Sequence, residues 1–116
     1  MTQEEILDYN KKCAEFLGVD IHYSVEVYKD SKSPLRQYID NRPKSEPLLF
    51  HSDWNWIMEV VEAIEKKGYE IDIFSNCVEI CDIPDENYIT EAVGKTKKEA
   101  VVQAINQFLI WYNENN

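Results

Sequence analysis

Aromatic and imidazole side chains gather in one short stretch of the chain. Phe50, His51, Trp54 and Trp56 lie just before and at the start of a predicted helix. Tryptophan is frequent at binding hot spots, and a long irregular segment precedes the cluster, so these residues are a candidate interaction anchor or ligand pocket. The alternative is that the same side chains fill the core from both sides of the helix.

Carboxylates form the second candidate surface. Residues 59–91 carry ten acids and two bases, so most of the net charge of −10 lies in this stretch. An acidic face can bind a basic partner or imitate nucleic-acid phosphate, and as a solvated face it simply keeps a protein soluble. The candidate residues of this acidic face are Glu59, Glu62, Glu70, Asp72, Glu79, Asp82, Asp85 and Glu86.

The sequence predicts no catalytic residue, no metal site and no cofactor. The three glycines do not form a phosphate-binding loop, and no EF-hand calcium loop is present. His22 and His51 share no metal-ligand spacing with each other or with a cysteine. Carboxylates are so abundant that a pair for acid and base catalysis can be drawn almost anywhere, so no such pair is informative.

The cysteines indicate a reducing compartment. Their odd number, with Cys13, Cys77 and Cys81, makes a poor disulfide framework in a small protein. Cys77 and Cys81 lie four residues apart in a predicted strand, hence about 13 Å apart, too far for a disulfide. Cys13 is expected to face the core.

The charge and hydropathy patterns limit the kinds of partner. An excess of ten negative charges argues against direct nucleic-acid binding and against an anionic membrane surface. No run of about 18 apolar residues is present, and the acidic first residues do not resemble a signal peptide. We therefore expect a protein of the cytoplasm whose partner is another protein.

A helix is predicted over residues 3–17. Thr2 and Glu5 have the spacing of a capping box, in which the hydroxyl accepts an amide hydrogen bond and the carboxylate accepts one from the cap amide. Apolar residues follow at helical spacing, and Gly18 suits the left-handed position that ends a helix.

Alternating apolar and polar residues predict a strand over residues 21–27. Residues 29–47 lack a period and contain three prolines, so a long irregular loop is expected there. Within it, Leu35, Tyr38 and Ile39 can form a short helical or extended piece that holds the loop in place.

A second helix is predicted over residues 54–67, capped by Ser52 or Asp53 and ended by Gly68. Its apolar residues occupy two stripes and leave only a narrow polar line. We therefore expect this helix to be covered on more than one side, by a sheet and by another helix.

Residues 69–81 predict a β-hairpin with its turn near Ser75 and Asn76. The alternation in both arms gives the sheet one apolar face. Residues 88–93 predict a further antiparallel strand, closed by Gly94.

Thr96 and Glu99 provide a second capping-box signal, for a final helix over residues 97–113. The element order is then α, β, loop, α, β, β, β, α. Consecutive strands with tight connections favour an α+β fold, with an antiparallel sheet of three to four strands packed with three helices. The length predicts a single domain over residues 1–116.

Several segments together resemble a known family. They are Ser52-Asp53-Trp54-Asn55-Trp56, the following Met58-Glu59-Val60-Val61-Glu62-Ala63-Ile64, Gly68-Tyr69-Glu70-Ile71 with its hairpin, and the helix from Thr96 to Tyr112. In layout, over most of residues 2–112, the chain resembles small phage and prophage proteins of the phage ABA sandwich domain. The resemblance implies helices on both sides of a sheet and a phage or prophage origin. It implies no reaction and no catalytic residue.

Three functional hypotheses follow from the sequence. The first is a non-enzymatic protein-binding or adaptor module of phage type, in the cytoplasm of a bacterial host. The second is a counter-defence inhibitor whose acidic face imitates nucleic-acid phosphate and occupies a basic cleft. The third is a small-ligand binder or enzyme with a pocket near Trp54 and His51.

Overall fold

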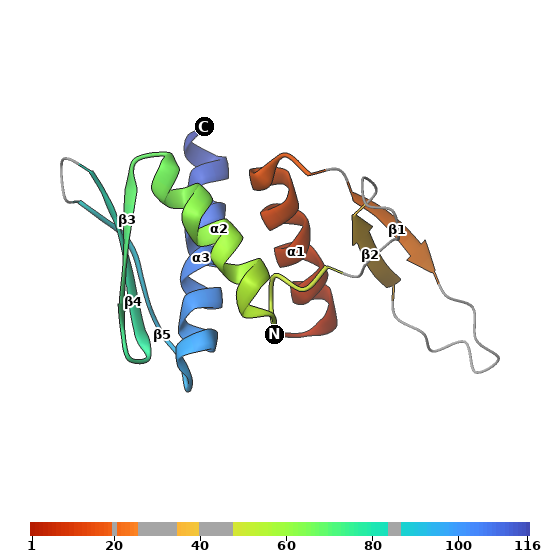
Figure 1. Cartoon of the computed structure of the whole chain (residues 1–116), viewed down its shortest axis with the longest axis horizontal. Helices are drawn as coiled ribbons and strands as arrows, with labels where there is room; N and C mark the ends of the chain where they lie inside the picture. Colours follow the sequence, from red (N-terminus) through yellow and green to blue (C-terminus); the bar gives the residue numbers. More distant parts are fainter. Residues whose placement is uncertain (20, 26–34, 40–47, 84–86) are drawn as a thin grey trace. The chain divides into compact units, whose positions relative to one another are not determined.

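A computed structural model of the chain describes residues 1–19, 21–25, 35–39, 48–83 and 87–116 (Figure 1). It has the predicted α+β class, with three helices and antiparallel strands. The chain divides into two compact units, Met1–His51 and Ser52–Asn116. A single domain over residues 1–116 stays a prediction.

Helix α1, Gln3–Leu17, opens the first unit and confirms the predicted helix. The Thr2 hydroxyl accepts from the Glu5 amide at 3.2 Å, and the Glu5 carboxylate accepts from the Thr2 amide at 3.3 Å. Gly18 ends the helix with φ 73°, which is the left-handed conformation that glycine adopts without strain. Cys13 is buried, as its position in the apolar stripe predicts.

Strand β1, Ile21–Val25, pairs antiparallel with strand β2, Leu35–Ile39, to form a two-stranded sheet. The prediction of irregular loop is therefore wrong for residues 35–39, where the extended alternative holds. The physical reason is that β2 is stabilised by hydrogen bonds to β1. A strand of five residues is too short to show a clear alternation of apolar and polar residues in the sequence. The rest of the predicted loop, and residues 26 and 27 of the predicted strand, lie outside the described residues.

Helix α2, Trp54–Lys66, opens the second unit. Asp53 is its N-cap, because the Asp53 carboxylate accepts a hydrogen bond of 2.8 Å from the Asn55 amide. Lys67 caps the other end, so the helix stops one residue earlier than predicted. As expected from its two apolar stripes, α2 packs both on the sheet and on the last helix.

Three strands form the sheet of the second unit, in the order β3, β4, β5: β3 is Tyr69–Phe74, β4 is Cys77–Asp82 and β5 is Tyr88–Val93. The predicted hairpin and third strand are confirmed. Ser75 takes φ 54° in the turn between β3 and β4. The pairing of β4 with β5 shifts register between Ile80 and Cys81, which is a β-bulge.

Helix α3, Lys97–Asn115, confirms the predicted final helix and extends it by two residues. The Thr96 hydroxyl accepts from the Glu99 amide at 3.1 Å, as in a capping box, but the Glu99 carboxylate accepts from the Lys95 amide instead of the Thr96 amide. Gly94 joins β5 to α3 so closely that a Cβ there would lie 2.6 Å from the Ala100 nitrogen.

Within the second unit, the described helices cover one face of the three-stranded sheet and leave the other face open. Helix α3 packs on β4 and β5, and α2 packs on β3, on the same side of the sheet (Figure 1). Val78, Ile80 and Ala92 are buried on this side, so the face covered by the helices is apolar. Both helices of this unit thus lie on one side, and they do not by themselves form the three layers that the family resemblance implies.

Candidate functional site

Three carboxylates form a row across the open side of the sheet. The strand register sets Asp72 opposite Glu79, and Glu79 opposite Glu91. Directly opposed side chains on one face of a sheet are about 5 Å apart at their Cβ atoms. The row therefore concentrates three negative charges on neighbouring strands.

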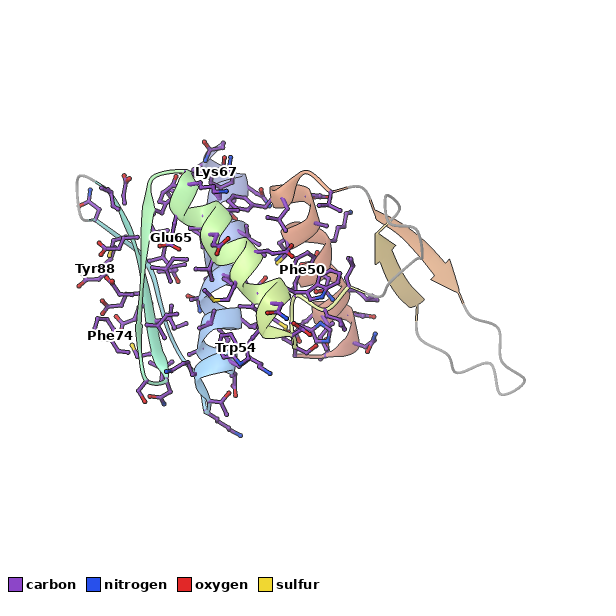
Figure 2. All side chains as sticks on the ribbon, viewed as in Figure 1. Phe50, Trp54, Glu65, Lys67, Phe74 and Tyr88 are labelled. Carbon is purple, nitrogen blue, oxygen red and sulfur yellow. The ribbon has the colours of Figure 1, made fainter. Side chains whose placement is uncertain are left out.

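Exposed side chains with apolar surface lie in the rows on both sides of the carboxylate row. In the row on one side, Phe74 is opposite Cys77 and Cys77 is opposite Val93; in the row on the other side, Cys81 is opposite Tyr88. The exposed fractions are 57% for Phe74, 61% for Val93 and 69% for Tyr88. Phe74 and Tyr88 lie on the side of the sheet away from α2 and α3 (Figure 2). We name this surface the outer face; it comprises Glu70, Asp72, Phe74, Cys77, Glu79, Tyr88, Glu91 and Val93.

The carboxylates of the outer face raise the pKa values of two other side chains on the same face. The pKa of the Tyr88 hydroxyl is raised, chiefly by the Glu79 carboxylate. Burial, followed by the charges of Glu91 and Glu79, raises the pKa of the Cys77 thiol, whose Sγ lies 3.8 Å from Glu91 Oε1. Residues 68–94 contain seven acids and no lysine or arginine. The strands therefore supply no cation of their own to this surface.

Only part of the predicted acidic face lies on the outer face. Glu70, Asp72 and Glu79 lie there, whereas Glu59 and Glu62 are on α2, which packs against the other side of the sheet. The remaining predicted acids are Asp82, which is opposite Tyr69 at the end of the hairpin, and Asp85 and Glu86, which lie outside the described residues.

The structure adds Glu91 to the acids that the sequence singles out. Glu91 is separated from Glu79 by the turn after β4, and only the strand register shows that the two are opposed. The signal available in the sequence is that Glu91 is the one charged residue of the predicted strand over residues 88–93. Because the bulge shifts the pairing by one residue, the register of β5 on β4 cannot be obtained by counting residues from the turn.

The predicted aromatic cluster is divided between the two units. Phe50 is buried and His51 half-buried in the first unit. Trp54 and Trp56 begin α2 in the second unit, where Trp54 is 38% exposed and its ring centroid lies 5.7 Å from Lys98 Nζ. A cation at this distance is attracted by the indole ring, which gives Trp54 a partner of its own within the second unit. A binding site that comprises Phe50, His51, Trp54 and Trp56 stays a prediction.

A buried amide lies beside His51 in the first unit. Asn10 Nδ2 is 3.2 Å from His51 Nδ1 and donates to the Leu48 carbonyl at 3.4 Å. Asn10 Oδ1 has no hydrogen-bond partner among the residues that the structure describes. Burial lowers the pKa of His51, and burial raises the pKa of the Cys13 thiol to about 12. A thiol with this pKa is a poor nucleophile at neutral pH.

The arrangement on the outer face is suited to recognition of another molecule. Carboxylates attract a cationic group, and the flanking apolar side chains provide surface to bury against a partner. Within the described ranges, no group of three or more His, Cys, Asp or Glu side chains is placed to hold a metal ion. None of the described helices is long and apolar enough to cross a membrane.

The fold defines an α+β protein whose second unit is an antiparallel sheet covered by helices on one side. Comparison of the chain with family models, with curated proteins and with solved structures finds no match.

Proposed function

We propose that the chain is a non-enzymatic protein-binding module that uses its outer face to bind a basic protein. The observation that carries this proposal is the row of Asp72, Glu79 and Glu91 between exposed apolar side chains. Protein interfaces combine an apolar centre with polar contacts, and complementary charge sets partner choice and association rate.

The family resemblance supplies the biological setting of the proposal. Proteins of the phage ABA sandwich type occur in phages and prophages, so we place this protein among phage or prophage adaptor modules that act in the cytoplasm of a bacterial host. A basic host or phage protein is then the expected partner.

A selection experiment tests the proposed function. The full chain is used to select binders from a displayed library of random peptides, and the binders are then tested against two double variants of equal charge change. Asp72→Lys with Glu79→Lys alters the outer face, whereas Glu59→Lys with Glu62→Lys alters α2. We expect lysine- and arginine-rich binders whose affinity falls at least about tenfold for the first variant, because opposed like charges cost several kcal/mol, and remains unchanged for the second.

The outcome that contradicts the proposal is equally specific. Binders that are not basic, or binders that respond to the α2 variant as strongly as to the outer-face variant, exclude the outer face as the binding surface. Circular dichroism of both variants provides the folding control.

A nucleic-acid mimic is the second candidate function, and the observation that favours it is the absence of any lysine or arginine from residues 68–94. A mimic must compete with nucleic acid for a basic cleft. If the chain binds a basic DNA-binding protein that has a duplex-sized cleft, and duplex DNA displaces it from that protein, the mimic is favoured. The exposed apolar side chains beside the carboxylate row favour the protein-binding module, because a phosphate surface has no counterpart to Phe74 and Val93.

A further inference from the structure

Among the described strands, β3 is an edge of its sheet, and its backbone groups on that edge pair with none of them. The Ile83 amide donates to the Gly68 carbonyl at 3.1 Å, which fixes the hydrogen-bonding phase of the β3 and β4 pair. In an antiparallel pair, every second residue directs its N–H and C=O away from the partner strand. Tyr69, Ile71 and Ile73 are therefore the residues whose backbone groups point to the free edge of β3.

The two edges of this sheet differ in regularity. β3 pairs with β4 without interruption over six residues, whereas β5 contains the bulge and is regular only from Thr90 to Val93. A bulge bends a strand and disrupts the ladder that a further strand would need. The edge of β3 is thus the longer template for an added strand.

The side chains of β3 alternate between two environments along this edge. Glu70, Asp72 and Phe74 belong to the outer face, whereas Tyr69, Ile71 and Ile73 face the helices, and Ile73 is 37% exposed. In an added antiparallel strand, residues opposite Glu70 and Asp72 occupy the closely spaced non-hydrogen-bonded positions. Lysine or arginine at those two positions meets the carboxylates. An apolar residue between them covers Ile71, and the next apolar residue on the far side of the Asp72 position covers Ile73.

A second copy of this chain does not fit the same edge. Every antiparallel register that pairs two or more of Tyr69, Ile71 and Ile73 with the same residues of a copy places Glu70 or Asp72 opposite an acid of the copy. Like charges directly opposite each other destabilise a sheet. Charge therefore selects a basic strand and rejects self-pairing.

We propose that the partner binds as an extended basic segment that adds a fourth strand to the edge of β3, with alternating basic and apolar residues. This inference rests on the proposed function, because it names the form in which the basic partner engages the acidic surface. Recognition by strand addition gives affinity through main-chain hydrogen bonds and specificity through alternate side chains.

The probe is the peptide Gly-Ser-Phe-Val-Lys-Val-Lys-Val-Ser-Gly, labelled with a fluorophore and titrated with the full chain. In the proposed register, its phenylalanine lies opposite Phe74 and its lysines lie opposite Asp72 and Glu70. A control peptide of the same composition, Gly-Ser-Phe-Val-Lys-Lys-Val-Val-Ser-Gly, cannot place both lysines on one face. We expect the first peptide to bind and the control to bind at least about tenfold more weakly.

Backbone methylation separates strand addition from other binding modes. The valine between the lysines directs its N–H to β3, whereas the lysine amides point away from β3. N-methylation of that valine is expected to weaken binding about tenfold, through one lost hydrogen bond and the steric effect of the methyl group, whereas N-methylation of the first lysine has little effect.

Two results overturn the inference, and they leave different conclusions about the proposed function. If both methylated peptides bind as well as the parent, the peptide lies on the outer face without joining the sheet, so strand addition is wrong while the protein-binding surface stands. If no peptide binds but selected basic binders still require Asp72 and Glu79, strand addition is likewise wrong and the protein-binding surface stands. If those binders also ignore the outer face, the proposed function fails as well.

Discussion

His51 shows how a single side chain makes stability depend on pH. Its imidazole is half-buried, and burial lowers its pKa from 6.5. The folded state therefore prefers neutral His51, whereas the unfolded chain binds a proton near pH 6.5. The contribution of His51 to stability is present above that pH and is lost as the pH falls below it.

The measurement is the free energy of unfolding at pH 8 and pH 5.5, for the natural chain and for His51→Gln. Glutamine does not titrate, so the stability of the natural chain relative to the variant should fall at the lower pH. Equal pH dependence of the two chains would show that His51 titrates alike in the folded and unfolded states.

At the level of the helix, Asp53 and Ser52 provide a matched pair of substitutions. The Asp53 carboxylate accepts from the Asn55 amide and Asp53 is the N-cap residue, whereas Ser52 precedes the cap. We expect Asp53→Ala to reduce the free energy of unfolding by about 1 kcal/mol and Ser52→Ala to leave it nearly unchanged. Chemical denaturation of both variants measures the difference. An equal effect of the two substitutions would mean that Asp53 is not the residue that caps the helix.

The carboxylate row makes a prediction about the sheet. Glu79 lies between Asp72 and Glu91, so Glu79→Gln removes the central charge and two repulsive pairs. We expect a gain of a few tenths of a kcal/mol to about 1 kcal/mol in unfolding free energy, which shrinks at high salt. Glu62→Gln on α2 is the control of equal charge change. A loss of stability in Glu79→Gln would mean that the row holds favourable contacts.

The sequence predicts best the features that depend on residues close together in the chain. The caps formed by Thr2 with Glu5 and by Gly18 need only local chemistry, and the structure confirms them. Strand β2 is different, because its residues pair with β1 residues that lie 10 to 18 positions earlier. Glu91 likewise joins the candidate site only through a register that the bulge has shifted. Pairing across distance, and not local preference, is what the sequence leaves open.

The division into two units makes a prediction for the whole molecule. The second unit holds a buried set of its own on α2, β4 and α3: Ile57, Val60, Val61, Ile64, Val78, Ile80, Val101, Ile105, Phe108 and Leu109. A single apolar core of this kind supports independent folding of a chain of about 60 residues. We expect residues 52–116, expressed alone, to unfold cooperatively.

Thermal unfolding followed by circular dichroism and by tyrosine and tryptophan fluorescence checks this expectation. Coincident transitions from the two signals would indicate a two-state domain. A broad, non-cooperative transition in residues 52–116, together with a cooperative one in the full chain, would show that the second unit needs residues 1–51 to fold.

The bulge in β5 also bears on how the protein behaves when it is concentrated. Growth of a fibre by edge pairing requires that one edge of a sheet accept the opposite edge of the next molecule. Here one edge carries acids and the other carries the irregular β5, itself acidic through Glu91. Neither edge complements the other, so the sheet can gain a strand from a foreign basic chain without becoming a template for its own polymerisation.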